Sequence, residues 1–405
     1  MAVCASQELG SAHDLRVDWP VVVLNTHHSG LAIARNLGPL GVRVLGLTAV
    51  PTFPGNASRW LEYRPAPDSL LEQERLLRML QNLARELDHP ALLFPTRDHD
   101  VNFISRHRSA LDEFYLIAQL PATELEPVMN KELLGAVARR VGIEVPNGVT
   151  VRKAEEIGQA KVLRFPCICK PLYASQWRKD GLWEAVGRQK ALKLESYSAL
   201  ESFYRGFSHL DPVVAVQEWI EGDEKDLQIF GSVCNARHEV AAWFTARKRL
   251  QYPPLAGTGI VVEALPLPEL EEPSRSLLRT LGFRGISEIE YKRDARDGRL
   301  YLIEINPRHW DQHGLGAAAG VNLSEALYRD VTAQRKRLMQ QRPDSVLWIA
   351  EVEYARHLAR CALGRAPWRD ALLGMSGKRT WSLYDASDLQ PVLARAGLRR
   401  KGPRL

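Results

Sequence analysis

Two apolar segments near residue 300 carry carboxylates at positions that a β-sheet would bury. Glu290 lies in the run Glu288–Tyr291, and Glu304 lies in the run Leu302–Ile305. An Asp-Ala-Arg-Asp-Gly sequence between them is typical of a turn, so the two runs predict neighbouring strands. Two buried carboxylates side by side are unfavourable unless a cation lies between them. The pattern therefore predicts a cation site, and the alternative is a solvent-exposed hairpin with ordinary acidic residues.

The residues after Glu304 specify the kind of site. Asn306 adds an amide carbonyl to the two carboxylates, and such hard oxygen ligands suit Mg²⁺ better than zinc. Arg308 lies two residues further on, on the same face of an extended chain, where its guanidinium can bind a phosphate. The predicted metal ligands of this metal-phosphate site are Glu290, Glu304 and Asn306.

The first part of the chain predicts a parallel α/β unit. Val21–Leu24 is a continuous β-branched run, which is typical of a strand buried on both faces. Helical spacing over Leu31–Leu40 and a second strand over Val42–Leu47 complete a Rossmann-like βαβ opening. The intervening loop reads His-His-Ser-Gly instead of the glycine-rich dinucleotide fingerprint, which argues against an ordinary NAD site. Its histidines, His27 and His28, are expected to be loop residues rather than metal ligands.

These features resemble the ATP-grasp superfamily, and the resemblance extends in the correct order over roughly residues 20–330. It looks closest to the carboxylate-amine ligase-like branch, which is distantly related to D-aspartate ligase, D-alanine-D-alanine ligase and biotin carboxylase. The resemblance implies an α/β fold with a Rossmann-like N-terminal subdomain over 18–125. An ATP-grasp domain over 126–333 would follow, with a lid over about 150–215 and a large α+β subdomain. Residues 334–405 are expected to form a helical C-terminal extension.

The resemblance also implies which residues bind the nucleotide. Lys131, at the start of a helix, and Lys170, at the end of a strand, match the two lysines that neutralise the phosphates. Glu224 matches an acid that binds the ribose. The hinge that binds the adenine is matched by Gln217, Glu218, Trp219 and Ile220.

Two positions depart from the family pattern. Residues 173–181 contain one glycine, whereas many members have a glycine-rich phosphate loop there. Either this is a solvated basic loop, or phosphate is bound by side chains, namely Ser175, Arg178, Lys179 and Lys190. Glu288 stands where members resembling D-alanine-D-alanine ligase have an arginine that supports the acyl phosphate. Its role is open between binding a second metal, binding the amine, and pairing with Arg284 or Lys292.

A basic run, Arg247–Arg249, lies between the hinge and the metal-binding strands. In the resemblance this is where the large subdomain faces the reacting groups. Lys248 and Arg249, together with Arg308, are therefore the residues predicted to stabilise a tetrahedral oxyanion. The alternative is an ordinary solvated surface. His313, after the metal-binding strand, is expected to be structural or, alternatively, a proton acceptor.

Composition bears on the class of protein. The 405 residues carry a net charge of +6, a mild excess that does not require nucleic acid as a partner. The five cysteines show neither a disulfide framework nor a zinc spacing, which fits a reducing cytosol. No apolar run reaches membrane-spanning length, and the N-terminus lacks the layout of a signal peptide. A cytoplasmic protein with no membrane contact is expected.

The expected activity follows from the resemblance. ATP with Mg²⁺ (or Mn²⁺) would convert a carboxylate into an acyl phosphate, and an amine would then displace the phosphate. The products would be an amide or peptide-type bond, ADP and phosphate. The partners would be a small-molecule carboxylate and amine of amino-acid-like character, with a homodimer as an option. The alternatives are a bicarbonate-using, carboxylase-type enzyme and a non-catalytic nucleotide-binding protein.

Overall fold

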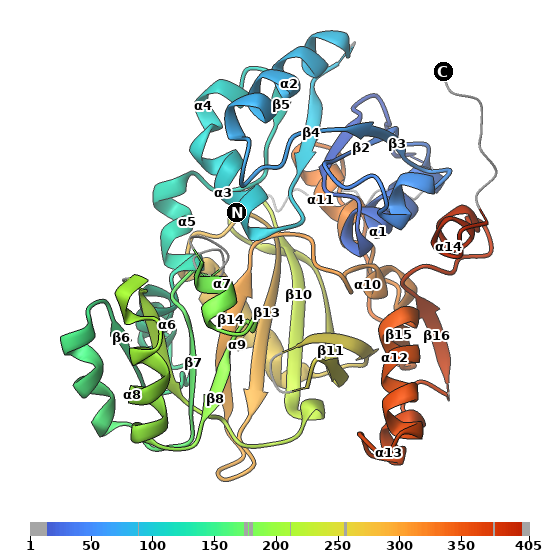
Figure 1. Ribbon diagram of the computed structural model, residues 1–405. Helices are drawn as coiled ribbons and strands as arrows, with labels where there is room; N and C mark the ends of the chain where they lie inside the picture. The colour runs from blue at the N-terminus through green and yellow to red at the C-terminus, as the bar shows by residue number, and fades with distance from the viewer. Residues whose placement is uncertain are drawn as a thin grey trace, which may run out of the picture.

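The computed structural model describes residues 14–398 except for 88, 174–176, 178–180, 211, 255–256 and 376. Three sheets organise these residues: one of five strands, one of four and one of seven. In Figure 1 the five-stranded domain lies at the top, the four-stranded lid at the lower left and the seven-stranded sheet in the centre. Of the loop side chains considered for phosphate, Ser175, Arg178 and Lys179 lie outside the described residues.

The N-terminal sheet is fully parallel, in the order β3-β2-β1-β4-β5. Its strands are β1 (Val21–Leu24), β2 (Val44–Thr48), β3 (Glu62–Pro65), β4 (Ala91–Phe94) and β5 (Tyr115–Leu116). Successive β1 side chains pack on opposite faces: Val23 joins a cluster with Leu37 of α1 (His28–Leu37), and Val22 joins one with Leu80 of α2 (Gln73–Glu86). Helices on both faces explain why this strand is a continuous apolar run, and the Rossmann-like opening is confirmed.

The lid is an antiparallel sheet in the order β6-β9-β7-β8. Its strands are β6 (Gly148–Val151), β7 (Cys167–Pro171), β8 (Leu192–Leu194) and β9 (Val214–Glu218). Cys167 and Cys169 pack with Val216 and with Leu200 of α8 (Tyr197–Arg205). Burial raises the pKa of both thiols to about 12, so they are inert apolar residues. By alternation, Lys170 lies on the opposite face of the lid sheet.

The central sheet has the order β14-β13-β10-β11-β12-β15-β16. Its strands are β10 (Leu227–Cys234), β11 (Val240–Tyr252), β12 (Thr258–Ala264), β13 (Gly285–Arg293), β14 (Leu300–Asn306), β15 (Val346–Ile349) and β16 (Lys378–Trp381). On β13 and β14, Ile289, Tyr291 and Ile305 pack against α6 (Lys131–Arg140) and α9 (Glu271–Thr280). The alternate positions on these strands carry the carboxylates, which therefore share the other face.

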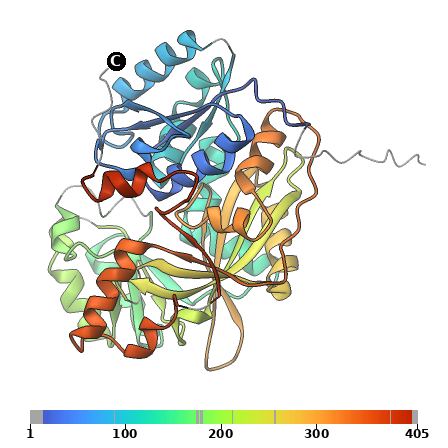
Figure 2. The same cartoon turned by 90° about the vertical axis from the view of Figure 1, so that its right-hand side faces the viewer.

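The C-terminal extension contains helices, as expected, and also two strands that were not expected. Its helices are α12 (Glu351–Ala362), α13 (Trp368–Ala371) and α14 (Gln390–Arg395). The apolar run before α12 forms β15, which pairs with β12, because a short apolar run does not by itself distinguish a strand from a helix. Figure 2 shows α12 beside the central sheet and α14 against the N-terminal domain. There, Asp388 accepts hydrogen bonds from Arg35 Nε at 3.1 Å and Ser58 Oγ at 2.7 Å.

The remaining α-helices are short connectors or lie beside the central sheet. They are α3 (Asp98–Arg106), α4 (Arg108–Leu111), α5 (Ala122–Met129), α7 (Leu182–Ala185), α10 (Gly314–Ala318) and α11 (Leu323–Val331). None of the helices in the described part of the chain is long and apolar enough to cross a membrane.

Candidate nucleotide and metal site

The two predicted carboxylates lie directly opposite each other. In the antiparallel ladder of β13 and β14, Glu290 is the partner of Glu304 and Glu288 is the partner of Asn306. Side chains opposite each other in such a ladder have their Cβ atoms about 5 Å apart. Glu288 and Glu290 are buried, at 3% and 8% exposure. The arrangement confirms that acidic side chains share one face of adjacent strands, and rules out the exposed hairpin.

Lys248 of β11 supplies positive charge to this face. Its Nζ atom lies 2.8 Å from both carboxylate oxygens of Glu290. Burial lowers the pKa of Lys248, but the nearby Glu290 and Glu288 outweigh it and hold the pKa above its ordinary value. In the protein without metal, a lysine thus provides the neutralisation that two adjacent carboxylates require.

Asn306 links the acidic residues. Its Nδ2 atom donates to Glu288 Oε2 at 3.0 Å and to Glu304 Oε1 at 3.4 Å. The other oxygen of Glu288, Oε1, is buried without a hydrogen-bond partner among the described residues. Burial, and then the charge of Glu290, raise the pKa of Glu288 to about 8. On this face, at least one carboxylate oxygen therefore has no hydrogen-bond donor among the described residues.

These donors fit a hard divalent cation in kind, although they are not arranged around one. Among the described residues, no group of three or more His, Cys, Asp or Glu side chains is arranged to hold a metal ion. Glu290 forms an ion pair with Lys248 at 2.8 Å and lies opposite Glu304 in the strand ladder. Carboxylate and amide oxygens with an unsatisfied acceptor suit Mg²⁺, which would take over the counter-charge role from Lys248.

Both predicted phosphate lysines approach the acidic face from other elements. Lys131 is the first residue of α6, after the N-cap Asn130, and its Nζ donates to Leu172 O at 3.5 Å. Lys170 is 9% exposed on β7. Burial, and then Lys131, lower the pKa of Lys170 to about 8, while Glu304 and Glu290 partly offset them. Two lysines and two carboxylates from α6, the lid and the central sheet therefore influence one another.

Arg308 connects the central sheet to the N-terminal domain. Its Nε donates to Asp98 Oδ1 at 2.6 Å, and an Nη atom donates to Asn306 Oδ1 at 3.1 Å. Asp98 is the first residue of α3, directly after β4. Asp98 was not predicted as a site residue, although its loop follows the carboxyl end of a parallel strand, where ligands commonly bind. The guanidinium is fixed by both domains at the edge of the acidic face.

Comparisons with known proteins show what the chain is similar to. No protein-family model matches the chain. The D-aspartate ligase of Enterococcus faecium (strain Aus0004) is 22% identical over 268 residues, which is 64% of this chain and 62% of the ligase. The chain thus spans less than two thirds of the length of that curated relative.

Two solved structures share the fold. The L-amino acid ligase from Bacillus licheniformis superposes with a TM-score of 0.60 at 15% identity, covering 82% of this chain and 79% of the ligase. The biotin carboxylase domain of the Hydrogenobacter thermophilus 2-oxoglutarate carboxylase, solved with MgADP, ADP and bicarbonate, gives 0.62 at 16% identity, with coverages of 81% and 73%. The chain therefore has the fold of these ATP-dependent enzymes, which is the ATP-grasp fold that its motifs led us to expect.

The segment that was predicted to bind the adenine follows β9, the last strand of the lid. The Glu218 N–H donates to Asn147 O at 2.8 Å, and the Trp219 N–H donates to Pro166 O at 2.9 Å. Both N–H groups are therefore engaged within the protein. None of the described residues accepts a hydrogen bond from the Ile220 N–H group. The Glu218 carboxylate accepts from the backbone N–H of Arg164 at 3.0 Å, away from this role.

Trp219 and Glu224, two further residues of the hinge region, make contacts within the protein that were not predicted. The Trp219 ring lies between two lysines, with Lys292 Nζ 4.5 Å and Lys193 Nζ 5.2 Å from its centroid. Neither lysine was predicted to act at the hinge, because they come from β13 and the lid. The Glu224 carboxylate accepts from the Gln251 N–H at 2.5 Å, and burial raises its pKa to about 7.

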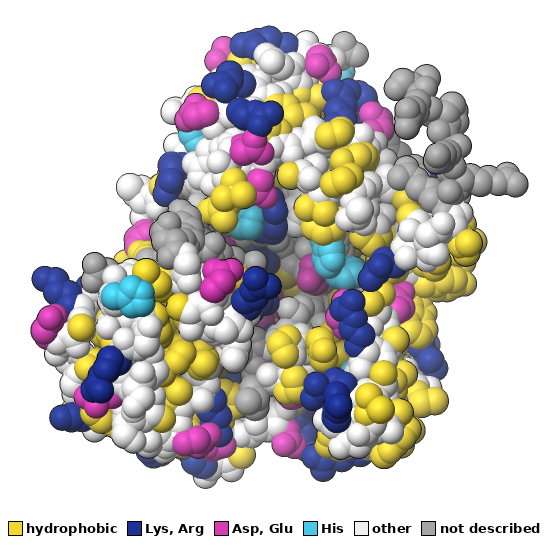
Figure 3. Space-filling view, viewed as in Figure 1, with side chains coloured by type: hydrophobic (Ala, Val, Ile, Leu, Met, Phe, Trp, Pro, Cys, Tyr) yellow, Lys and Arg dark blue, Asp and Glu magenta, His cyan; other side chains and the backbone are white. Residues whose placement is uncertain are grey.

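A cavity of about 290 Å³ lies between α6, the lid sheet and β14. Its walls include Lys131 and Gln217, two of the predicted nucleotide residues, and Ile303 from the central sheet. A hollow in the middle of the face seen in Figure 3 is bordered by basic, acidic and histidine side chains. The lid and the central sheet thus enclose space beside the phosphate lysines.

Arg249 and His313 do not join the acidic cluster. Arg249 forms an ion pair with Glu263 of β12 at 2.7 Å, and Arg247 binds the same carboxylate at 2.9 Å. Adjacent residues of a strand point to opposite faces, so only Lys248 of the basic run contacts the acidic residues. His313 is fully buried, and its Nδ1 lies 2.7 Å from Trp310 O. Because burial lowers the pKa of His313 to about 4, a structural role is favoured.

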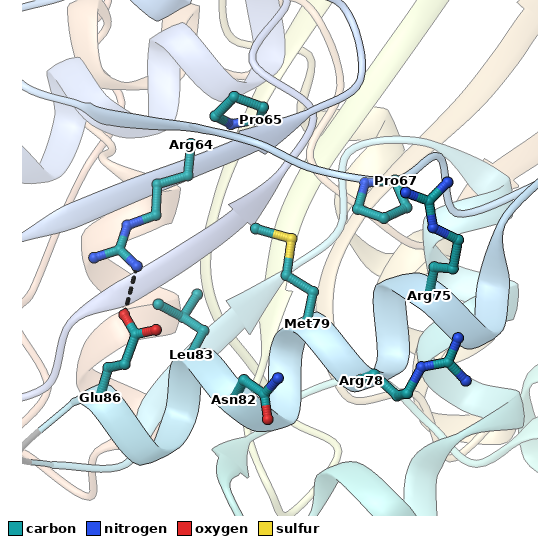
Figure 4. Close-up of a pocket in the computed structure, with 9 residues that line it drawn as sticks. All are labelled: Arg64, Pro65, Pro67, Arg75, Arg78, Met79, Asn82, Leu83 and Glu86. Carbon is teal, nitrogen blue, oxygen red and sulfur yellow. Dashed lines mark hydrogen bonds and ion pairs between the residues drawn. The ribbon is translucent and has the colours of Figure 1, made fainter. Parts of the chain in front are cut away.

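A second groove, of about 560 Å³, lies on the N-terminal domain and is lined by none of the predicted site residues. Figure 4 shows it between α2 and the segment from Arg64 to Pro67. Arg64 is bound to Glu86 at 2.7 Å, and Arg75 pairs with Glu72. Its basic side chains are thus partly neutralised at the surface, and the groove is not part of the candidate site.

Proposed function

We propose that the chain is an ATP-dependent carboxylate-amine ligase that works through an acyl phosphate. The observation that supports this most is the approach of Lys131 and Lys170 to the paired Glu290 and Glu304. Cationic groups from α6 and the lid face a carboxylate pair. This arrangement suits a nucleoside triphosphate with its divalent cation. The names of the superfamily relatives, a D-aspartate ligase and an L-amino acid ligase, agree with bond formation between a carboxylate and an amine.

The proposed reaction has two displacements. A carboxylate oxygen of the first substrate attacks the terminal phosphorus of ATP, and ADP leaves. The nitrogen of an amine then attacks the acyl carbon, phosphate leaves with the former carboxylate oxygen, and the nitrogen loses a proton. The products are an amide, ADP and phosphate.

The residues of this chain would mainly position and neutralise charge, which is the larger part of catalysis in phosphoryl transfer. Lys131 and Lys170 would bind phosphate oxygens. Glu290, Glu304 and Asn306 would hold Mg²⁺, or Mn²⁺ in its place, which when bound adds positive charge next to the phosphates. Arg308, fixed by Asp98, would stabilise the oxyanion of the tetrahedral intermediate.

Adenine and ribose would be bound at the end of the lid. The free Ile220 N–H group would donate to the base, with Gln217 in the wall of the adjoining cavity. Glu224 would accept a hydrogen bond from a ribose hydroxyl. The Gln251 N–H group already binds the Glu224 carboxylate and so orients it before the ribose binds. Glu218 and Trp219 would shape the hinge rather than contact the base through their N–H groups.

Bicarbonate as the carboxylate substrate is the second candidate. The similarity to a biotin carboxylase domain solved with MgADP and bicarbonate favours it. Both candidates begin with phosphorylation of a carboxylate oxygen, so they share the nucleotide site. A non-catalytic nucleotide-binding role is less consistent with the set of Lys131, Lys170, Glu290, Glu304 and Arg308.

Hydroxylamine traps acyl phosphates as hydroxamates and provides the test. The purified protein is incubated with ATP, Mg²⁺, hydroxylamine and a panel of amino acids, other carboxylates and bicarbonate, and ADP is measured together with hydroxamate. We expect one or more organic carboxylates to support both products. ADP formation with bicarbonate alone would favour the second candidate. Absence of ADP with every carboxylate would contradict both.

Glu304→Gln is the matching variant, because it keeps the side-chain shape and removes the charge. It should reduce hydroxamate formation by orders of magnitude. Glu74→Gln removes one negative charge from the exposed surface of α2 and serves as the control. Turnover by Glu304→Gln equal to that of Glu74→Gln would remove the basis of the proposal.

A further inference from the structure

Three segments that are far apart in the sequence meet beside Arg308. They are the start of α1, the loop after β14, and α12 of the C-terminal extension. The Ser29 Oγ donates to Asp311 Oδ1 at 2.8 Å, which joins the first two. His27 lies within electrostatic range of both Asp311 and Glu353, which brings in α12. Asp311 is also within range of Arg308, so this cluster adjoins the candidate site.

Aromatic rings form one side of the cluster. The ring centroid of His27 is 4.1 Å from that of His28 and 5.0 Å from that of Phe53. The His28 ring in turn lies 6.2 Å from Trp348 of β15. His28 is 9% exposed, and its Nδ1 atom has no hydrogen-bond partner among the described residues. A buried polar atom left in this way indicates that the cluster is a polar site rather than ordinary packing.

The charges of the cluster do not balance. Burial raises the pKa of Asp311, but His28, His27, the Ser29 hydrogen bond and Arg308 outweigh it, so the carboxylate is ionised at neutral pH. Burial, and then His28, lower the pKa of His27, although Asp311 and Glu353 partly offset them. Among the described residues no lysine or arginine lies within ion-pair distance of Asp311, and Arg308 is bound to Asp98.

Glu353 adds a second carboxylate. One of its oxygens, Oε1, lies 3.5 Å from Arg356, whereas Oε2 is buried without a hydrogen-bond partner among the described residues. Asp311 and Glu353, together with the Ser29 hydroxyl, thus lie near His27, and one oxygen of Glu353 has no hydrogen-bond partner among the described residues. An ammonium group has three donors and a positive charge, and aromatic faces nearby also attract it.

We propose that Asp311 and Glu353, with Ser29 and His27, bind an ammonium group of the amine substrate. The inference rests on the proposed ligase function and deepens it, because it assigns the amine to a subsite that adjoins Arg308. It also gives the C-terminal extension a role in substrate choice, since α12 carries Glu353. The substrate class is an amine that is cationic at neutral pH, such as an amino acid or a diamine.

Direct binding tests the subsite without any turnover. Saturation-transfer NMR is recorded with the common L-amino acids and 1,4-diaminobutane, on wild-type protein and on Asp311→Asn, Glu353→Gln and the control Glu74→Gln. For one or more of these amines, affinity should fall by about tenfold in Asp311→Asn and in Glu353→Gln and stay unchanged in the control. Because two near-isosteric variants are measured, a folding defect in one of them still leaves the other as a test. No amine binding to the wild type, or equal binding to all variants, would overturn the proposal.

Hydroxylamine distinguishes this proposal from the proposed function. It is uncharged at neutral pH and needs no ammonium subsite. Asp311→Asn and Glu353→Gln should therefore form hydroxamate within about twofold of the wild-type rate, while KM for the binding amine rises about tenfold. Loss of hydroxamate formation in both folded variants would contradict a role confined to the amine. Absence of hydroxamate with the wild type would fail the ligase proposal alone, and amine binding would still decide the subsite.

Discussion

The Nζ atom of Lys248 lies 2.8 Å from each carboxylate oxygen of Glu290, although β10 separates their strands. The residue of β10 that lies opposite Glu290 is Ile229, which carries no charge, so the counter-charge for Glu290 comes from the next strand, β11. A lysine therefore balances the acidic face when no metal does, and its removal has a definite consequence.

Lys248→Met should destabilise the protein by about 3–5 kcal/mol, because it leaves the buried Glu290 without its partner. Urea unfolding in the absence of metal provides the measurement. Mg²⁺ with ATP should restore part of the loss, since the cation replaces the missing charge. The double variant Lys248→Met, Glu290→Gln should be more stable than the single one. If Lys248→Met unfolds at the wild-type urea concentration, the ion pair does not have the importance given to it here.

Arg249→Met should leave amine-dependent ADP formation within about twofold of wild type, in contrast to Lys248→Met. Arg249 binds Glu263 on the face of β11 away from the acidic residues, and Arg247 binds the same carboxylate, so Glu263 keeps a partner when Arg249 is replaced. Steady-state kinetics of the two variants provide the comparison. A large loss of kcat in Arg249→Met would return this residue to the catalytic set.

Nucleotide binding should weaken as the pH rises through about 8, because the pKa of Lys170 is lowered to that value and its charge is then lost. Lys170→Arg keeps its charge at every accessible pH and should flatten the profile. Calorimetric titration of ATP between neutral and alkaline pH measures both. The lowered pKa of Lys170 has the opposite effect on the stability of the fold. Between the folded-state pKa and the ordinary value of 10.5, Lys170 is protonated in the unfolded chain but not in the folded protein. Stability of the nucleotide-free protein should therefore rise with pH in that window.

Asp98→Asn should lower kcat by about tenfold to a hundredfold with a smaller change in KM for ATP. Asp98 acts through Arg308, whose guanidinium it holds at 2.6 Å, and loss of the charge loosens the position of a group that acts on the reacting atoms. Asp98→Glu should recover part of the rate. A change confined to KM for ATP would instead indicate that Asp98 affects only nucleotide binding.

Local sequence patterns predicted much of the site because they depend on residues close together in the chain. Glu290, Glu304 and Asn306 fall on adjacent strands joined by one turn, so their register follows from alternation. Lys131 at the start of α6 and Lys170 on β7 are likewise where the local pattern predicted them. Residues 335–341 form no helix, although they lie in the C-terminal extension that was expected to be helical.

Partners from separate elements could not be predicted in this way. Nothing in the neighbourhood of Asp98 identifies Arg308, 210 residues away, as its ion-pair partner. The same holds for Glu353 and His27, and for the choice between Lys248 and Arg249. That choice was decided by which face of β11 points to the acidic residues.

The sequence by itself determined the fold class, through the resemblance of its motifs to the ATP-grasp pattern, and the row of acids on β13 and β14, because their alternation is a property of local periodicity. Only the tertiary structure decided how the charges are balanced. It turned Lys248 to Glu290 and Arg249 to Glu263, fixed Arg308 with Asp98, and brought α12 next to the start of α1. The physical reason is that the energy of a buried charge depends on the groups around it in space, and those groups come from strands, helices and loops that chain order does not bring together.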